Sequence, residues 1–131
     1  MTNEQARELG RRWLAAGGPW LDGMLLSADV SGTVYRLNGS KGVGGTLVSK
    51  RGAVLPWRRK PLLAPDFRDG ATKGAALEWL RGHLGRSVYP APDAFGAGWW
   101  WLRNDGDSFF TGAPTEAELY PLAAEALKGA P

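Results

Sequence analysis

Cysteine is absent from this chain of 131 residues, and histidine occurs once, as His83. The absence of cysteine excludes disulfides, thiolate catalysis and the thiolate ligands of most structural zinc sites. A single histidine argues against a catalytic triad and against a metal site built from several imidazoles. His83 falls near the end of an expected helix, where its charge suits the helix dipole, so we interpret it as structural.

Long apolar runs are also missing, and the first residues, MTNEQARELGRRW, do not form a charged leader followed by an apolar segment. We therefore expect a soluble, cytoplasmic protein with no membrane partner. Apolar residues make up 44% of the chain and charged residues 22%, the composition of an ordinary globular protein. The length suits one domain, residues 1–131.

Acidic residues are missing from the window 30–65, which holds seven basic residues. These are Arg36, Lys41, Lys50, Arg51, Arg58, Arg59 and Lys60. From residue 104 to the end the balance reverses, with five acidic residues against one lysine. Either the two regions pair within the fold, or the basic window meets a phosphate backbone or an acidic protein.

The first half of the chain predicts one helix followed by an antiparallel meander. The helix begins after Thr2, which can form a capping box with Gln5, and ends at the sequence Gly-Gly-Pro, residues 17–19. Four short apolar runs follow, separated by turns that contain Gly32, Gly39 and Gly52. Pro56 predicts that the last run is an edge strand or stops there.

The second half predicts two more helices. One begins after Asp69, its N-cap, and ends at Gly85. The other begins at Thr115, and Pro121 either kinks this helix or marks its true start. Together these elements predict a single α+β domain, an antiparallel sheet with about three helices packed on it.

Three consecutive tryptophans, residues 99–101, lie between those two helices. We expect a loop over residues 88–98, then a hairpin that pairs the tryptophans with residues 108–110. On a strand, Trp99 and Trp101 face one side and Trp100 the other. The strand is either buried on both sides or presents an aromatic face to a partner, and we interpret it as mainly core.

Two patterns resemble catalytic or ligand sites but are better explained structurally. The glycine-rich segment 38–46 lacks the Gly-Lys-Ser/Thr ending of a phosphate loop, so we interpret it as a hairpin loop. The carboxylate pairs Asp66/Asp69 and Asp105/Asp107 would suit metal binding or acid–base chemistry. However, Asp69 is explained as a helix cap and the second pair as turn chemistry. We therefore expect no enzyme, no cofactor and no metal.

The stretch LPWRRKP, residues 55–61, is the best interaction candidate. Cations supply phosphate contacts and a tryptophan supplies a stacking face. The alternative is a solvated basic edge that prevents strand pairing. The candidate partner-binding or nucleic-acid-binding residues are Lys50, Arg51, Trp57, Arg58, Arg59 and Lys60.

Three segments resemble a group of small, mostly uncharacterised phage and prophage proteins. GGPWLDGMLL, with Trp20, Gly23 and Met24, is similar to a strand that follows their first helix. PDFRDGATKGAALEWLR is similar to their second helix, and GWWWLRNDGDSFFTGAPTEAELYPLAAEAL to their tryptophan hairpin and last helix. The matching residues of the second segment are Pro65, Asp66, Asp69, Ala71, Thr72, Gly74 and Leu77. The second half also resembles the layout of the phage α-β-α sandwich domain.

The resemblance implies a non-enzymatic phage or prophage accessory protein that binds a host protein. A defence nucleoprotein such as a CRISPR complex is one such partner, which would make the chain an anti-CRISPR-like inhibitor. The shared pattern does not include residues 50–60, so this stretch is the candidate for specificity. A nucleic-acid-binding module is the alternative function, and an exposed strand edge or tryptophan face would also allow a homodimer.

Overall fold

The computed structural model describes residues 1–39, 45–56, 63–96, 98–103 and 112–129. Over these residues the chain forms three helices and seven strands, so the predicted α+β class is confirmed. The helices are α1 (Asn3–Ala15), α2 (Gly70–Leu84) and α3 (Glu116–Gly129). The strands are β1 (Leu25–Ser27), β2 (Val34–Asn38), β3 (Thr46–Ser49), β4 (Val54–Pro56), β5 (Ala64–Pro65), β6 (Tyr89–Pro92) and β7 (Trp99–Leu102).

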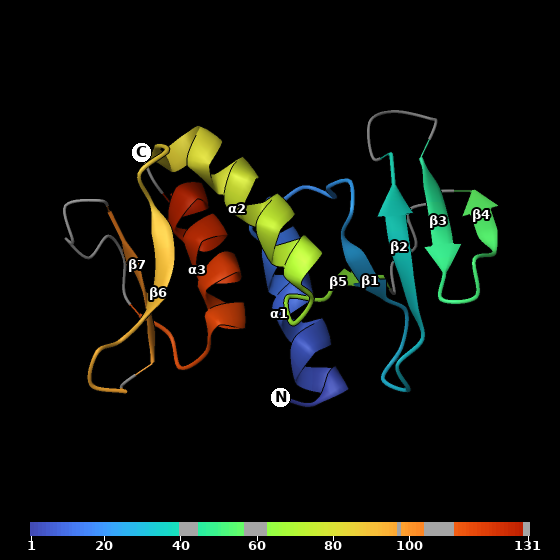
Figure 1. The fold of residues 1–131 in the computed structure, drawn as a ribbon, viewed down its shortest axis with the longest axis horizontal. Coiled ribbons are helices and arrows are strands. Elements are labelled where there is room, and N and C mark those ends of the chain that lie inside the picture. The colour runs from blue at the N-terminus through green and yellow to red at the C-terminus, as the bar shows by residue number, and fades with distance from the viewer. Residues whose placement is uncertain (40–44, 57–62, 97, 104–111, 130–131) are drawn as a thin grey trace.

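Five of the strands form one antiparallel sheet in the order β4-β3-β2-β1-β5. The predicted meander is therefore confirmed, and β4, which ends at Pro56, is an edge strand as expected. The helices lie in the middle of the molecule, with the five-stranded sheet on one side and the β6–β7 hairpin on the other (Figure 1). β4 is the strand farthest from the helices, which leaves it outside the main core (Figure 1).

Local capping signals fix where two helices begin. Thr2 accepts a hydrogen bond from the backbone of Gln5, whose side chain accepts one from the backbone of Thr2, which confirms the capping box. Asp69 accepts from the backbone N–H of Thr72 at 2.9 Å, which confirms it as the cap of α2. α3 already begins at Glu116 and continues through Pro121, so a helix that starts at the proline is wrong.

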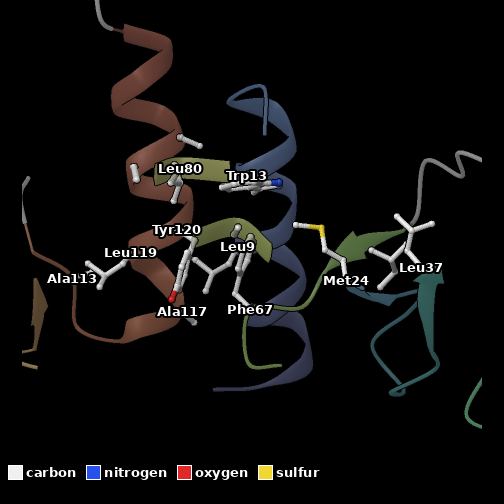
Figure 2. Close-up of a cluster of buried hydrophobic side chains, with 14 of the residues drawn as sticks. Leu9, Trp13, Met24, Leu37, Phe67, Leu80, Ala113, Ala117, Leu119 and Tyr120 are labelled. Carbon is white, nitrogen blue, oxygen red and sulfur yellow. The ribbon is translucent and has the colours of Figure 1, made fainter. Parts of the chain in front are cut away.

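A chain of buried aromatic rings links the helices. Trp13 of α1 meets Phe67 edge-on at a centroid distance of 5.3 Å, and Phe67 stacks on Tyr120 of α3 at 5.5 Å. Tyr120 in turn meets Trp101 of β7 edge-on at 5.5 Å. Figure 2 shows the rings of Trp13, Phe67 and Tyr120 between α1 and α3. The core therefore lies within the helical layer and reaches both sheets.

The tryptophan run alternates as predicted. Trp101 is 0% exposed, and its indole N–H donates to the carbonyl of Leu119 in α3 at 2.9 Å. Trp99 lies on the same side of β7 and packs partly buried against the core. Trp100 faces the opposite side and is half-buried. The run is thus core on one face only, and residues 108–110, its expected partners, lie outside the described residues.

The prediction of a loop over residues 88–98 is wrong for residues 89–92, which form β6 and pair with β7. Pro90 and Pro92 suggested a loop because proline cannot donate to a ladder. The Asp93 N–H donates to the carbonyl of Gly98, so Asp93 and Gly98 form a hydrogen-bonded pair of the antiparallel ladder. Bonded and non-bonded pairs alternate, so the nitrogens of Pro90 and Pro92 face away from β7 and the ladder loses no donor.

The opposite side of the helical layer packs α1 directly on β5. Gly10 of α1 is buried, and a Cβ there would clash with the carbonyl oxygen of Pro65 and lie 2.9 Å from its nitrogen. The close approach therefore requires glycine at this position, and α1 covers the β5 edge of the sheet. None of the described helices is both long and apolar enough to cross a membrane.

Substitution of Gly10 by alanine should lower the free energy of unfolding by about 1–3 kcal/mol, because the added methyl group separates α1 from β5. Gly74→Ala is the matched control, since Gly74 lies in α2 with open space around it. This change should raise stability by about 0.5–1 kcal/mol through helix propensity. Urea unfolding measures both, and equal shifts would contradict the close packing at Gly10.

Trp101→Phe should destabilise the fold by about 2 kcal/mol, since it removes buried volume and the hydrogen bond to Leu119. Trp100→Phe, on the outward face of the same strand, should change stability by about 0.5 kcal/mol. Thermal unfolding of the two variants compares the contribution to stability of the core face and the outward face of β7. A larger loss for Trp100→Phe would reverse the assignment of the core face.

Candidate interaction surface

The structure places two of the six candidate binding residues. Lys50 and Arg51 connect β3 to β4 and are exposed. Trp57, Arg58, Arg59 and Lys60 lie outside the described residues. The site is therefore built from Lys50, Arg51 and the strands that carry them.

The β3–β4 turn is fixed by its own backbone. The N–H of Gly52 donates to the carbonyl of Ser49 at 2.9 Å, which closes a four-residue turn with Lys50 and Arg51 at its centre. Gly52 has a φ of 86°, a conformation that favours glycine. The N–H of Ser49 then donates to the carbonyl of Ala53 and starts the β3–β4 ladder. Two adjacent cations are thus displayed on a defined turn at the end of the sheet.

One face of the sheet carries Lys50 beside apolar side chains, and Arg51 follows it on the turn. Leu25, Arg36, Val48 and Val54 are partners in register across β1 to β4, so they lie on the same face. By the same register, Val34 and Lys50 lie next to this row on that face. We call this surface the outer sheet face, defined by Leu25, Val34, Arg36, Val48, Lys50 and Val54.

The opposite face carries the buried leucines Leu26, Leu37 and Leu47, which belong to the core. All six residues of the outer sheet face are half-buried or exposed. Alternation along β2 and β3 therefore separates a core face from a face that is open to contact.

Two shallow hollows occur on this surface, and both include Val34, Ser49 and Lys50. One lies at the end of the sheet and is also lined by Gly32, Thr33, Tyr35 and Arg51. The other lies along the strands and is also lined by Leu25, Arg36 and Val48. Lys50 therefore stands at the boundary of both hollows, with an aliphatic floor beside it.

Arg36 differs from Lys50 and Arg51, the two cations of the β3–β4 turn, because its guanidinium already forms an ion pair within the fold. Its guanidinium donates to both carboxylate oxygens of Asp69, at 2.6 and 3.2 Å, and to the carbonyl of Gly23. Among the described residues, no ion pair involves Lys50 or Arg51. Lys50 and Arg51 are thus the positive charges on or beside this face that can pair with a negative charge on a partner.

Asp69 connects the outer sheet face to the cap of α2. Burial by itself raises the pKa of its carboxyl, but hydrogen bonds from Arg36 and from the backbone and hydroxyl of Thr72 outweigh this effect. The pKa therefore lies below its ordinary value. The carboxylate stays ionised and joins β2 to the first turn of α2.

The residues considered for acid–base chemistry are engaged in structural contacts. Asp66 pairs with Arg68 at 2.8 Å and Asp69 with Arg36, so the two carboxylates face different arginines. His83 is exposed on the last turn of α2, with its ring 4.4 Å from that of Trp79. No group of three or more histidine, aspartate or glutamate residues suited to a metal occurs in the described part of the chain. Asp105 and Asp107 lie outside it.

The valines of the outer sheet face were not identified from the sequence as part of a binding site. The available signal was the alternation in VYRLN and TLVS, in which Leu37 and Leu47 point to the core face. The alternate positions, Val34, Arg36 and Val48, could therefore have been assigned to the opposite face of the sheet. Which of these side chains remain accessible depends on how far the helices extend over the sheet.

A second exposed apolar surface lies on the β6–β7 hairpin, at the other side of the molecule (Figure 1). Trp100 and Leu102 line a hollow there with Pro92, Asp93 and Ala94, and Phe95 is 95% exposed. This surface lacks a cluster of charge among its described residues. It therefore gives less information about a partner than the outer sheet face.

Asp69→Asn should lower the free energy of unfolding at pH 7 by about 1–2 kcal/mol, since it removes the charge that holds Arg36. A depressed carboxyl pKa stabilises the fold above the unfolded pKa of about 3.9 and loses this effect as pH falls through the folded pKa. The difference between the wild-type protein and the variant should therefore shrink as pH falls below about 4. Urea unfolding from pH 7 to pH 2.5 measures this difference.

Glu4→Gln is the control for this series, because Glu4 is exposed on the first turn of α1. Its effect should stay within about 0.5 kcal/mol at each pH. A difference in the free energy of unfolding between the wild-type protein and Asp69→Asn that stays constant with pH would contradict the role of the ionised carboxylate.

Comparison with known protein families, curated proteins and solved structures found no match to this chain. The function is therefore inferred from the geometry of the chain itself.

Proposed function

We propose that this chain is a non-enzymatic binding module that recognises an acidic protein through the outer sheet face. The observation that carries the proposal is the pair Lys50 and Arg51, held exposed on the β3–β4 turn with no ion pair among the described residues. A patch of one charge beside an apolar floor is complementary to an acidic surface with an apolar centre.

The floor of this face favours a protein over a nucleic acid. Val34, Val48 and Leu25 are aliphatic and offer no ring on which a base can stack. Tyr35 lines the hollow at the end of the sheet, but its side chain also packs against the core. The alternative function, nucleic-acid binding, depends on Trp57 as the stacking ring and on Arg58, Arg59 and Lys60 as further phosphate contacts.

The biological role that we propose is that of a phage or prophage accessory protein acting on a host protein. Its support is the resemblance of three segments to small phage proteins, together with the small size of the chain. A defence nucleoprotein is a suitable partner because such complexes carry acidic and basic grooves. Inhibition of that complex, as by an anti-CRISPR protein, would follow if the chain occupies such a groove.

Arg51→Glu should reduce capture of the protein partner by about tenfold or more, because it reverses a charge on the turn that borders the outer sheet face. Arg86→Glu is the matched control. It changes the net charge equally, on an exposed side chain near the end of α2 whose ion pair within the described part of the chain is with exposed Glu78. Tagged wild-type protein and both variants are incubated with lysate of the cell that carries the gene, with and without nuclease. The proteins retained are then quantified by mass spectrometry.

The proposal is supported by a stoichiometric protein that survives nuclease, binds wild type and Arg86→Glu equally, and is lost with Arg51→Glu. Capture that is abolished by nuclease and falls steeply with salt would establish the nucleic-acid alternative. Equal capture by both variants would exclude the outer sheet face as the contact.

A further inference from the structure

The two edges of the five-stranded sheet differ in accessibility. The β5 edge is covered, because α1 packs against it at Gly10. The β4 edge has no neighbouring strand in the described part of the chain. The side chains on β4 are exposed, Val54 by 64% and Leu55 by 40%. β4 is thus an accessible edge with apolar side chains on both faces.

The ladder defines which backbone groups of β4 point outward. Ser49 and Ala53 form a hydrogen-bonded pair, and bonded and non-bonded pairs alternate along an antiparallel ladder. Leu55 therefore bonds to β3, whereas the N–H and C=O of Val54 point away from β3. Pro56 also presents its C=O outward and has no N–H to present. One donor and two acceptors are available at this edge.

We propose that β4 accepts an extended, acidic segment of the partner protein as a sixth strand of the sheet. This inference rests on the proposed function and specifies how the partner binds. Val54 supplies the backbone donor, and Lys50 and Arg51 lie in the turn that leads into the same strand, where they pair with carboxylates at one end of the added segment. Strand addition of this kind takes affinity from the main chain and specificity from the adjacent side chains.

Charge argues against a second copy of this chain as the occupant. A pair of β4 strands from two copies would bring together the sequences that flank this strand. The chain is basic on both sides of β4, with Lys50 and Arg51 before it and Arg58, Arg59 and Lys60 after it in the sequence. Like charges would therefore meet, which disfavours self-pairing and favours an acidic segment.

Pro56 limits the hydrogen bonds that β4 offers to an added strand. Because it lacks an N–H, it presents an acceptor and no donor at its position. Val54 therefore supplies the outward N–H of β4 and sets the register of the partner segment. This restriction also protects the free protein from unlimited edge-to-edge association.

The test uses the peptide EEVTVTVEE, with both termini blocked, and the ¹⁵N-labelled full chain. Glutamates at both ends place a carboxylate next to Lys50 and Arg51 in either strand direction. The expected result is a downfield shift of the Val54 amide proton and slower exchange of this amide with solvent. The amide of Leu55, already bonded to β3, serves as the internal reference. The peptides KKVTVTVKK and EEVPVPVEE are the controls for charge and for backbone donors, and neither should bind.

Val54→Pro removes the outward N–H while leaving the β3 ladder unaltered, and Val54→Thr keeps this N–H with a side chain of similar shape. Binding of EEVTVTVEE should weaken by about tenfold or more with Val54→Pro and by less than about twofold with Val54→Thr. Equal affinities would overturn strand addition, as would the absence of a Val54 shift in the wild-type protein. If Val54→Pro fails to fold, the wild-type exchange measurement alone decides between these results.

The captured partner separates this inference from the proposed function. Loss of capture with both Arg51→Glu and Val54→Pro supports strand addition. Loss with Arg51→Glu but not with Val54→Pro leaves the proposed function standing and overturns strand addition. Capture that neither variant alters overturns both. Concentration-dependent dimerisation that is abolished by Val54→Pro would identify a second copy as the occupant and overturn the acidic segment.

Discussion

The stacking of Phe67 on Tyr120 joins the two sides of the molecule. Phe67 comes two residues after β5 and therefore belongs to the side of the five-stranded sheet. Tyr120 lies in α3 and meets Trp101 of the β6–β7 hairpin. Burial raises the pKa of the Tyr120 hydroxyl, and Glu116 adds to this effect, so the ring stays neutral in the core.

The candidate surface lies at the opposite end of the five-stranded sheet from these rings. β1 and β5 are held by the helices, whereas β3 and β4 extend outward and carry Lys50 and Arg51 at their turn (Figure 1). A binding surface placed away from the core can change its side chains at little cost in stability, since surface substitutions have small effects. The chain therefore combines a buried helical layer with a β3–β4 hairpin whose turn residues are exposed.

The cations on and beside the outer sheet face differ in what they contact. Arg36 is committed to Asp69, which also caps α2, so this cation stabilises the junction between the sheet and the helices. Lys50 and Arg51 are displayed by a turn that depends on its own backbone and on Gly52. The same basic window of the sequence thus contains one structural cation and two that are suited to an external partner.

Short-range features were determined by the sequence itself. The capping box of Thr2 and Gln5, the Asp69 cap, the glycine turns and the edge position of β4 each depend on residues a few positions apart. The alternation of Trp99, Trp100 and Trp101 also followed from strand geometry alone. These signals were sufficient for the α+β class and for the location of the basic hairpin.

Only the tertiary structure decided the long-range pairings. β5 returns to pair with β1 across the sheet, and β6 pairs with β7 although it contains two prolines whose nitrogens face outward. Arg36 and Asp69 are 33 residues apart, so the sequence could not show that Arg36 has an ion-pair partner while Lys50 and Arg51 have none among the described residues. Local propensity acts over one turn or one hairpin, whereas the partner of a charge or a strand edge is chosen when distant segments pack together.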